Sequence, residues 1–394
     1  MKNMKFILSA VLLLVSLIAS VQPAYARPKD TPFFEWPDLN PAIAPGTLLR
    51  YQRMSLPAFY RAKAWRILYM TRDYADRPIL SSGMVVLSGY APPNPAARNI
   101  VAWAHPTTGV ARKCAPSMRQ SPTNSIVGFN DLIPAGYIIA ATDYPGLGTP
   151  GPMGYLVGKG QGQAVIDSVR AARQIPDVGG SNRYALWGYS QGGHAALFAA
   201  NMASAYAPEL ELVGVAAAAP PTNLVTLLGE TIGSLEGRIL AAMTLESWSV
   251  KYSVPLGTLV DSTVARVISA VTSNCVDDLG GKLDAVAAEK PLKDKFLTYN
   301  PSTQPPWSSF MTANSISKLP RGVPAFIAQG KADEIVRRDV TRQFVQAQCA
   351  AGIAVKYLTL DGMDHGGTAK ASSGSAIGWI GDRFAGKTAP SSCN

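Results

Sequence analysis

The sequence predicts an α/β fold with a mostly parallel central sheet and helices on both of its faces. Two observations carry this prediction. Short apolar runs of strand length alternate with longer helical stretches. The runs are also continuously apolar, as in strands buried on both faces of a parallel sheet. The expected strands are residues 100–104, 137–142, 184–187, 212–217, 325–328 and 355–360.

Two further extended runs precede this region. Residues 64–73 and 79–88 are rich in β-branched and apolar side chains, and a short polar turn separates them. This pattern predicts an antiparallel pair. The segment before them, 27–57, is rich in proline and aromatic residues without a clear period, and we interpret it as an irregular arm.

The regular alternation breaks once, between the strands that end near 219 and begin near 323. About 100 residues separate them, far more than such connections usually have. We predict that 225–318 form a helical cap inserted into a core made of 27–224 and 319–394. The cap either moves over the site or is a subdomain buried for stability. Its helical periodicity is carried by Leu228, Ile232, Leu235, Ile239 and Met243, and again by Val260, Val264, Val267 and Val271.

The first 26 residues have the three parts of a secretory signal peptide. Lys2 and Lys5 precede an apolar run over 6–21, and Ala24-Tyr25-Ala26 follows. The alternative is a single membrane anchor, but the run contains serines and is shorter than the roughly 20 residues that span a bilayer. We expect cleavage after Ala26, a secreted or periplasmic protein, and no transmembrane segment in the mature chain.

The chain is basic, with a formal net charge of +10. Removing the two lysines of the expected signal peptide leaves 10 − 2 = +8. Because the Lys and Arg residues are scattered rather than gathered in a run, we expect no nucleic-acid partner. Transient attraction to anionic lipid or envelope surfaces fits this charge better.

Four cysteines in an exported chain favour disulfide bonds. Four cysteines allow three pairings. We favour Cys114 with Cys275 and Cys349 with Cys393, since the second pair would tie the C-terminus to a preceding helix. With no CxxC pair and three histidines, we expect no metal site.

The strongest local signal is the G-x-S-x-G sequence around Ser190. It follows the apolar run 184–187 and precedes the helix-like run 195–202. In this setting the sequence is typical of the nucleophile elbow of α/β-hydrolases, where flanking glycines allow a tight turn that exposes the serine hydroxyl. We therefore predict Ser190 to be the nucleophile.

The general base is then one of three histidines. In this fold the acid and the histidine follow the serine in the chain, so the base belongs in a loop after the last strand. His365 comes directly after 355–360. His194 lies four residues beyond the serine, where a buried packing role is expected, and His105 ends another strand.

The acid should follow the preceding strand, 325–328. Asp333 is our choice, because the chain reads Gly330-Lys331-Ala332-Asp333 at the end of that strand. Glu334 and, more remotely, Asp339 are the alternatives. Such an acid orients the imidazole and stabilises the imidazolium.

The oxyanion of an acyl-transfer intermediate needs backbone donors. One should be the N–H of Gln191, the residue after the nucleophile, and the other should come from the loop after 100–104. That loop begins His105-Pro106-Thr107-Thr108. Proline has no N–H, so Thr107 or Thr108 must supply the second donor.

These residues together resemble the secretory lipase family, the lipase A type of yeasts and bacteria. The resemblance covers most of the mature chain and implies an α/β-hydrolase core with a helical cap, secretion, and cofactor-free hydrolysis of acylglycerols and other carboxylic esters. Pro106 departs from the small residue usual at its position. The residues that carry the resemblance are Gly188-Tyr189-Ser190-Gln191-Gly192, His105 with Thr107-Thr108-Gly109, Cys114-Ala115-Pro116-Ser117, Asp143-Tyr144 before Gly146-Leu147-Gly148, and Asp333 with His365.

We therefore expect a secreted serine carboxylic-ester hydrolase that uses no cofactor, acts through an acyl-enzyme, and contacts small-molecule or lipid esters. An acyltransferase or a peptidase on the same triad is the alternative, because a fold does not fix the substrate. From another class, a catalytically idle binding protein could keep the fold, but the complete triad argues against it.

Overall fold

The computed structural model of the chain describes residues 32–36, 39–276 and 279–393. The expected signal peptide, 1–26, lies outside these residues. Residues 32–394 form one compact unit, which alone is described below. Among the described residues, the helices are all too short or too polar to cross a bilayer.

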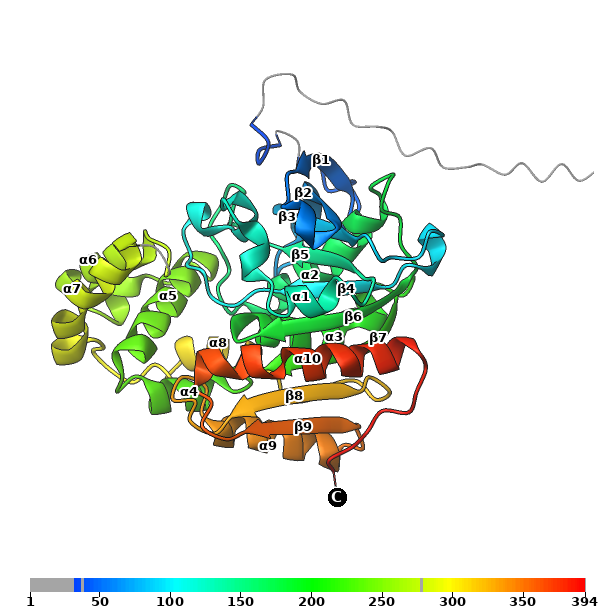
Figure 1. Ribbon diagram of the computed structural model, residues 1–394. Helices are drawn as coiled ribbons and strands as arrows, with labels where there is room; N and C mark the ends of the chain where they lie inside the picture. The colour runs from blue at the N-terminus through cyan, green and yellow to red at the C-terminus, as the bar shows by residue number, and fades with distance from the viewer. Residues whose placement is uncertain (1–31, 37–38, 277–278, 394) are drawn as a thin grey trace, which may run out of the picture. The chain divides into compact units, whose positions relative to one another are not determined.

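A nine-stranded sheet forms the core of this unit (Figure 1). Its spatial order is β1-β2-β3-β5-β4-β6-β7-β8-β9. The six strands from β4 to β9 run parallel to one another, and β1, β2 and β3 pair antiparallel with their neighbours. This confirms the predicted mostly parallel sheet. The strands are β1 (Leu48–Met54), β2 (Ala62–Arg72), β3 (Pro78–Ser88), β4 (Ile100–Ala104), β5 (Ile138–Thr142), β6 (Arg183–Tyr189), β7 (Glu211–Ala218), β8 (Ala325–Gly330) and β9 (Val355–Leu360).

Strand β1 corrects the sequence interpretation of 27–57 as an irregular arm. It lies at the edge of the sheet and pairs only with β2. Arg50 is its one buried residue, and the Arg50 guanidinium donates to the carbonyl of Pro32 at 2.6 Å and lies over the Trp36 ring. An edge strand with so little apolar burial has almost no hydrophobic pattern to detect.

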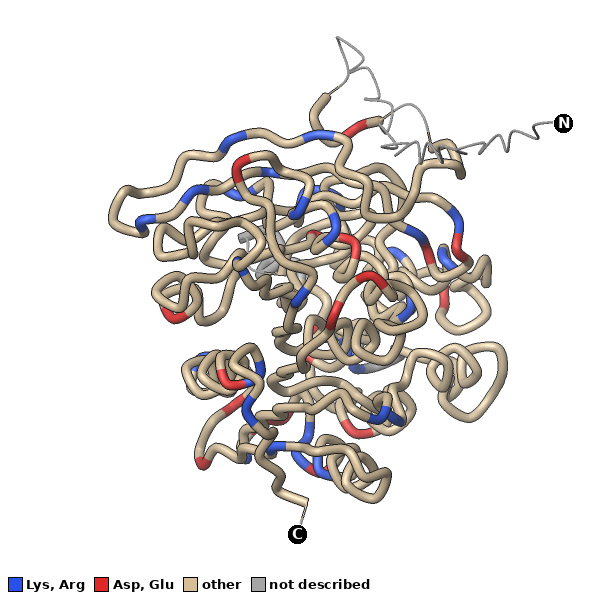
Figure 2. Tube along the Cα trace, turned by 90° about the vertical axis from the view of Figure 1, so that its right-hand side faces the viewer, with Lys and Arg blue, Asp and Glu red and all other residues tan. Residues whose placement is uncertain are grey.

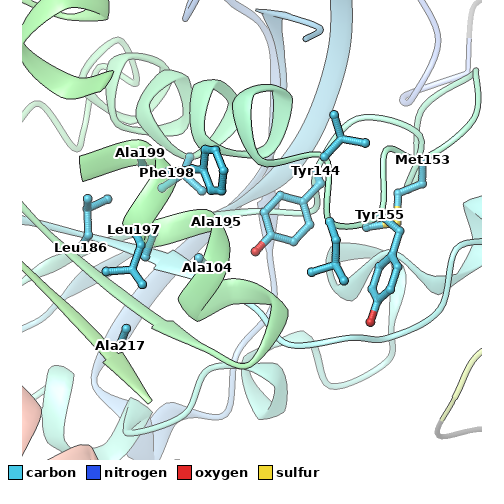
Figure 3. Packing of buried hydrophobic residues seen from close by; sticks show 14 of the residues in the cluster. Ala104, Tyr144, Met153, Tyr155, Leu186, Ala195, Leu197, Phe198, Ala199 and Ala217 are labelled. Carbon is cyan, nitrogen blue, oxygen red and sulfur yellow. The ribbon is translucent and has the colours of Figure 1, made fainter. Parts of the chain in front are cut away.

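Helices cover both faces of the sheet, and the pleat divides the core into two layers. In β4, Ile100, Ala102 and Ala104 pack in the layer of α2, α3 and α9, whereas Val101 and Trp103 pack in the layer of α1 and α10. Figure 3 shows part of the first layer, and α10 crosses in front of the sheet in Figure 1. The helices are α1 (Phe129–Leu132), α2 (Gly158–Arg173), α3 (Gln191–Tyr206), α4 (Leu224–Thr231), α5 (Leu235–Lys251), α6 (Ser262–Thr272), α7 (Leu279–Lys295), α8 (Trp307–Ala313), α9 (Arg338–Ala350) and α10 (His365–Phe384).

Helices α4 to α8 form the long connection between β7 and β8. The periodic row expected from Leu228 to Met243 is divided into two helices, because Ser234 caps α5 by accepting from the Gly237 N–H at 3.0 Å. Asp261 caps α6 in the same way. This connection contains helices, as its periodicity indicated. Its role as a cap with boundaries at 225 and 318 stays a prediction.

Two disulfides are present, with the pairing that the sequence favoured. Cys114–Cys275 joins a short 3₁₀ helix after β4 (Arg112–Cys114) to the segment after α6, 161 residues along the chain. Cys349–Cys393 joins α9 to the C-terminal segment. One bond therefore links the α4–α8 connection to the core, and the other fastens the end of the chain.

Basic and acidic residues are interspersed along the trace rather than separated into two regions (Figure 2). Several form ion pairs with each other, including Arg170 with Asp167 and Glu209. This distribution agrees with the scatter of charge along the sequence.

Candidate active site

Ser190 lies at the turn from β6 into α3, with a backbone φ of 54° and ψ of −123°. A non-glycine residue at positive φ is strained, and such strain is often found at functional sites. The turn is tight enough to exclude side chains on both sides. A Cβ on Gly188 would collide with the Gly192 carbonyl, and one on Gly192 would collide with the carbonyl of Ala104.

The Ser190 hydroxyl contacts His365, the first residue of α10, which follows β9 after a four-residue turn. Oγ of Ser190 lies 2.8 Å from Nε2 of His365. The preceding residue, Asp364, caps α10 by accepting from the Gly367 N–H at 2.7 Å. Tyr189 fixes His365 from the other side, because its hydroxyl donates to the His365 carbonyl at 2.9 Å and its ring packs on the imidazole.

Asp333 completes this row of hydrogen bonds. Its Oδ2 lies 2.8 Å from Nδ1 of His365, and its side chain is fully buried. An ionised carboxylate only accepts, so Nδ1–H is the donor and Nε2 is left to accept from the serine hydroxyl. Oδ1 of Asp333 accepts from the N–H groups of Ile335 and Val336, at 3.0 and 2.9 Å.

The two alternative acids, Glu334 and Asp339, make no hydrogen bond to His365 in the described structure. Glu334 points to solvent. Asp339 is also exposed and pairs with Arg342 at 3.2 Å. The structure therefore brings Ser190, His365 and Asp333 together and leaves both alternatives outside.

His194 and His105 are buried away from this row. His194 donates from Nε2 to the Asn314 carbonyl at 2.8 Å, and burial lowers its pKa to about 4. His105 contacts the Pro106 carbonyl through Nδ1, and burial lowers its pKa to about 4 as well. Both imidazoles are therefore neutral at pH 7 and serve the packing around the elbow.

The loop after β4 begins in close contact with the first turn of α3. Its position follows from the pairing of Ala104 with Gly188 and from the crowding of Gly192 against the Ala104 and His105 carbonyls. Gln191 is the first residue of α3, so its N–H has no partner within the helix. The hydroxyl of Thr107 contacts Tyr155, whereas that of Thr108 is buried without a protein partner.

An apolar pocket opens beside Ser190 and Gln191. Its space, including the open mouth, is about 670 Å³. Most of its wall comes from the connection between β7 and β8, and Ile335 and Val336 contribute from the loop that carries Asp333. The wall residues from that connection are Pro221, Leu224, Leu227, Leu228, Thr231, Gly237, Leu240, Ala241, Thr244, Leu245, Trp248 and Met311.

Sequence reasoning missed three residues that hold the site. Tyr189 was visible in the elbow motif, but nothing indicated that it would contact His365. Gln329 donates to Asp333 at 3.0 Å from the end of β8, and Tyr155 comes from the loop after β5. These partners are set by the fold, so their types alone carry no signal.

Among the described residues, no three His, Cys, Asp or Glu side chains gather in a way that could hold a metal ion. Asp143, which the resemblance singled out, is buried beneath the loop after β4. It accepts hydrogen bonds from Ser82 and from the N–H of Ser117, while burial raises its pKa. These bonds fasten the loops behind the site.

The model of the secretory lipase family matches residues 122–392, about two thirds of the chain. The chain belongs to the secretory lipase family. It is therefore a hydrolase of the lipase and esterase type. A secreted triacylglycerol lipase of Malassezia globosa is 26% identical, over 98% of this chain and 88% of its own length. Lipase 5 of Candida albicans is also 26% identical, over 97% and 87%.

Solved structures agree on the α/β-hydrolase fold. Candida antarctica lipase A in its closed state superposes with a TM-score of 0.77 at 18% identity, covering 93% of this chain and 88% of its own. A rice cell wall degrading esterase of Xanthomonas oryzae gives 0.68 at 18% identity, covering 85% and 97%. The family also agrees with the expected export of this secretory lipase, whereas cleavage after Ala26 stays a prediction.

Proposed function

We propose that this secretory lipase hydrolyses fatty-acyl carboxylic esters through a covalent acyl-enzyme on Ser190. The observation that carries the proposal is the unbroken row of hydrogen bonds from Asp333 through His365 to Ser190, with 2.8 Å at each step. A serine hydroxyl is a weak nucleophile until an adjacent base takes its proton. His365 is oriented for that task, and Asp333 fixes its tautomer.

In the first step, Ser190 Oγ attacks the ester carbonyl carbon as its proton passes to Nε2 of His365. The tetrahedral intermediate collapses when His365 returns that proton to the leaving alcohol, which departs. Water then attacks the acyl-enzyme, giving its proton to His365, and the acid leaves as Ser190 recovers its hydrogen. Buried Asp333 stabilises the imidazolium in both steps, and its bonds from Ile335 and Val336 hold the carboxylate against the imidazole.

The negative oxygen of each intermediate is stabilised by the N–H of Gln191 and an N–H from Thr107 or Thr108. The position of Gln191 at the start of a 16-residue helix adds the positive end of the helix dipole. Removing one donor of this kind typically costs about 100-fold or more in turnover. Such stabilisation needs donors that are in place before the reaction.

The pocket beside Ser190 supports an acyl chain as the group bound. Leucine side chains dominate its wall, and burying a CH₂ group is worth about 0.8 kcal/mol. The relatives named as secreted triacylglycerol lipases favour acylglycerols among the candidate esters. In this proposal the α4–α8 connection works as a cap that forms the acyl site, and the mature protein meets its substrate at a lipid surface after export.

Labelling with a fluorophosphonate probe tests the proposal. We expect the wild type and the control Ser262→Ala, an exposed serine of α6, to be labelled equally. Ser190→Ala should remain unlabelled and should lose hydrolysis of nitrophenyl esters and emulsified triglycerides. An unlabelled wild type, or equal labelling of Ser190→Ala, would remove the serine-hydrolase mechanism. Activity confined to short soluble esters would remove the fatty-acyl assignment.

A further inference from the structure

The loop that follows β4 lacks regular secondary structure from His105 to Gly109. Its backbone therefore receives no support from sheet or helix ladders, although an oxyanion site needs fixed donors. At its start, the His105 carbonyl accepts from the Tyr144 hydroxyl and the His105 ring contacts the Asp143 carbonyl. Beyond His105, the described residues show two anchors on this loop, and both come from outside the strand that precedes it. One holds Thr107 and the other holds Thr108.

The Thr108 anchor comes from the segment after α6. The Val276 N–H donates to the Thr108 carbonyl at 3.1 Å. The adjacent residue, Cys275, is bonded to Cys114, only six residues beyond Thr108. Lys113 reinforces this connection by donating to the Asn274 side chain at 2.6 Å.

Gly109 shows how closely the loop after β4 packs against residues 274–276. Its φ is +125°, and a Cβ at this position would lie 2.7 Å from the Cys114 sulfur and 3.1 Å from the Asn274 carbonyl oxygen. Any side chain here would push the loop and the 274–276 segment apart. The loop is thus fitted to the disulfide as well as hydrogen-bonded beside it.

The Thr107 anchor comes from the loop after β5. The Thr107 and Tyr155 hydroxyls lie 2.8 Å apart. Tyr155 is itself fixed on α5, because its N–H donates to Ser247 and its carbonyl accepts from the Trp248 indole, both at 2.8 Å. Figure 3 shows Tyr155 beyond Tyr144, at the margin of the core cluster.

These two anchors bracket a single peptide group, the one that joins Thr107 to Thr108 and carries the Thr108 N–H. We propose that Tyr155 and the segment Asn274-Cys275-Val276 are positioning residues that hold this peptide group for the oxyanion. The inference rests on the proposed function. It makes the α4–α8 connection part of the catalytic apparatus as well as a wall of the acyl pocket, because both anchors lead back to it.

Loosening either anchor should slow turnover, and loosening the Thr108 anchor should do so without weakening substrate binding. A misplacement of about 1 Å can cost on the order of 100-fold in rate. We therefore expect Val276→Pro, which lacks the donating N–H, and Cys114→Ala/Cys275→Ala to lower kcat by about 10- to 100-fold. For these variants KM should change by less than about threefold, since Val276, Cys114 and Cys275 do not line the acyl pocket.

Matched variants separate positioning from general damage. Val276→Ala keeps the N–H and should retain wild-type kcat. Cys349→Ala/Cys393→Ala removes the other disulfide, which is remote from the loop, and should also retain kcat. Tyr155→Phe keeps the ring and loses only the hydroxyl, so it tests the second anchor even if Val276→Pro does not fold.

Inhibition by an alkyl trifluoromethyl ketone gives a readout specific to the oxyanion. The ketone forms a hemiketal on the serine, and its inhibition constant should rise by the same factor as kcat/KM falls. Complete fluorophosphonate labelling of each variant shows that Ser190 is still active, and a wild type that fails to label would refute the proposed function instead. Labelled variants with kcat and ketone inhibition within about twofold of wild type would overturn the positioning role.

Discussion

Replacing Asp333 by asparagine gives the sharpest test of the hydrogen-bonded row. Oδ1 of Asp333 accepts from two backbone N–H groups, those of Ile335 and Val336. An NH₂ group in place of Oδ1 would face these two donors, so the asparagine must place its side-chain oxygen there. The NH₂ group then takes the position of Oδ2, where it faces Nδ1 of His365.

This orientation of the asparagine changes the tautomer of His365. With a donor opposite it, Nδ1 must accept, and the imidazole proton moves to Nε2. Nε2 can then no longer accept the proton of Ser190. The corresponding change in serine proteases lowers kcat by about 10⁴-fold, and we expect the same order here, equivalent to about 5 kcal/mol in the barrier.

The fold should survive this substitution. Gln329 loses its bond to the acid but still donates to the carbonyls of Gly330 and Val336. We would measure kcat on a nitrophenyl ester together with the thermal midpoint. The matched control is Glu334→Gln, an exposed neighbour, whose kcat should stay within about twofold of wild type. A folded Asp333→Asn enzyme that keeps more than about a tenth of the wild-type kcat would refute the assignment of the acid.

Three further outcomes follow from the same structure. Ser190→Gly should be more stable than Ser190→Ala by about 1 to 2 kcal/mol in denaturant unfolding, because glycine relieves the strained φ of 54°; equal stability would contradict the strain. Burial lowers the pKa of His194 to about 4, below the 6.5 of an unfolded chain, so its contribution to stability is complete above pH 6.5 and is lost as the pH falls toward 4. In unfolding measured at pH 7.5 and 5, the wild type should lose about 2 kcal/mol more than His194→Gln, which keeps the similar contribution of His105, and equal losses in both proteins would count against this role of His194. Removing Cys349–Cys393, which closes a loop of 44 residues, should lower the free energy of unfolding by about 4 kcal/mol in the chain-entropy model, and a change below about 1 kcal/mol would show that the bond does not restrain the unfolded chain.

The parallel strands and the triad geometry were accessible from the sequence for the same physical reason. A strand buried on both faces must be apolar throughout, and the elbow must have glycine where a Cβ would collide. His365 then followed from chain order, since it comes directly after β9. The sequence favoured Asp333 and kept the adjacent Glu334 as an alternative. The turn after β8 decides which carboxylate is buried, and the structure buries Asp333 and exposes Glu334.

Strand β1 was missed for the opposite reason. It pairs through its backbone at the edge of the sheet, and most of its side chains meet solvent. Backbone pairing leaves little trace in residue types when no face is buried. Residue types also could not predict the contact of Tyr155 with Thr107, which joins two separate loops, or that of Gln329 with Asp333, which depends on the shape of the turn after β8.

The loop after β4, from His105 to Gly109, shows how much of the proposed oxyanion site can be predicted from local sequence. Pro106 has no N–H, so the sequence alone restricts the second oxyanion donor to Thr107 or Thr108. What holds these threonines lies far away in the chain: the Cys114–Cys275 bond spans 161 residues, and Tyr155 belongs to a different loop. In our proposal the motif therefore supplies the N–H groups that stabilise the oxyanion, and the α4–α8 connection keeps them in place. Changes in that connection should accordingly affect turnover as well as the choice of acyl chain.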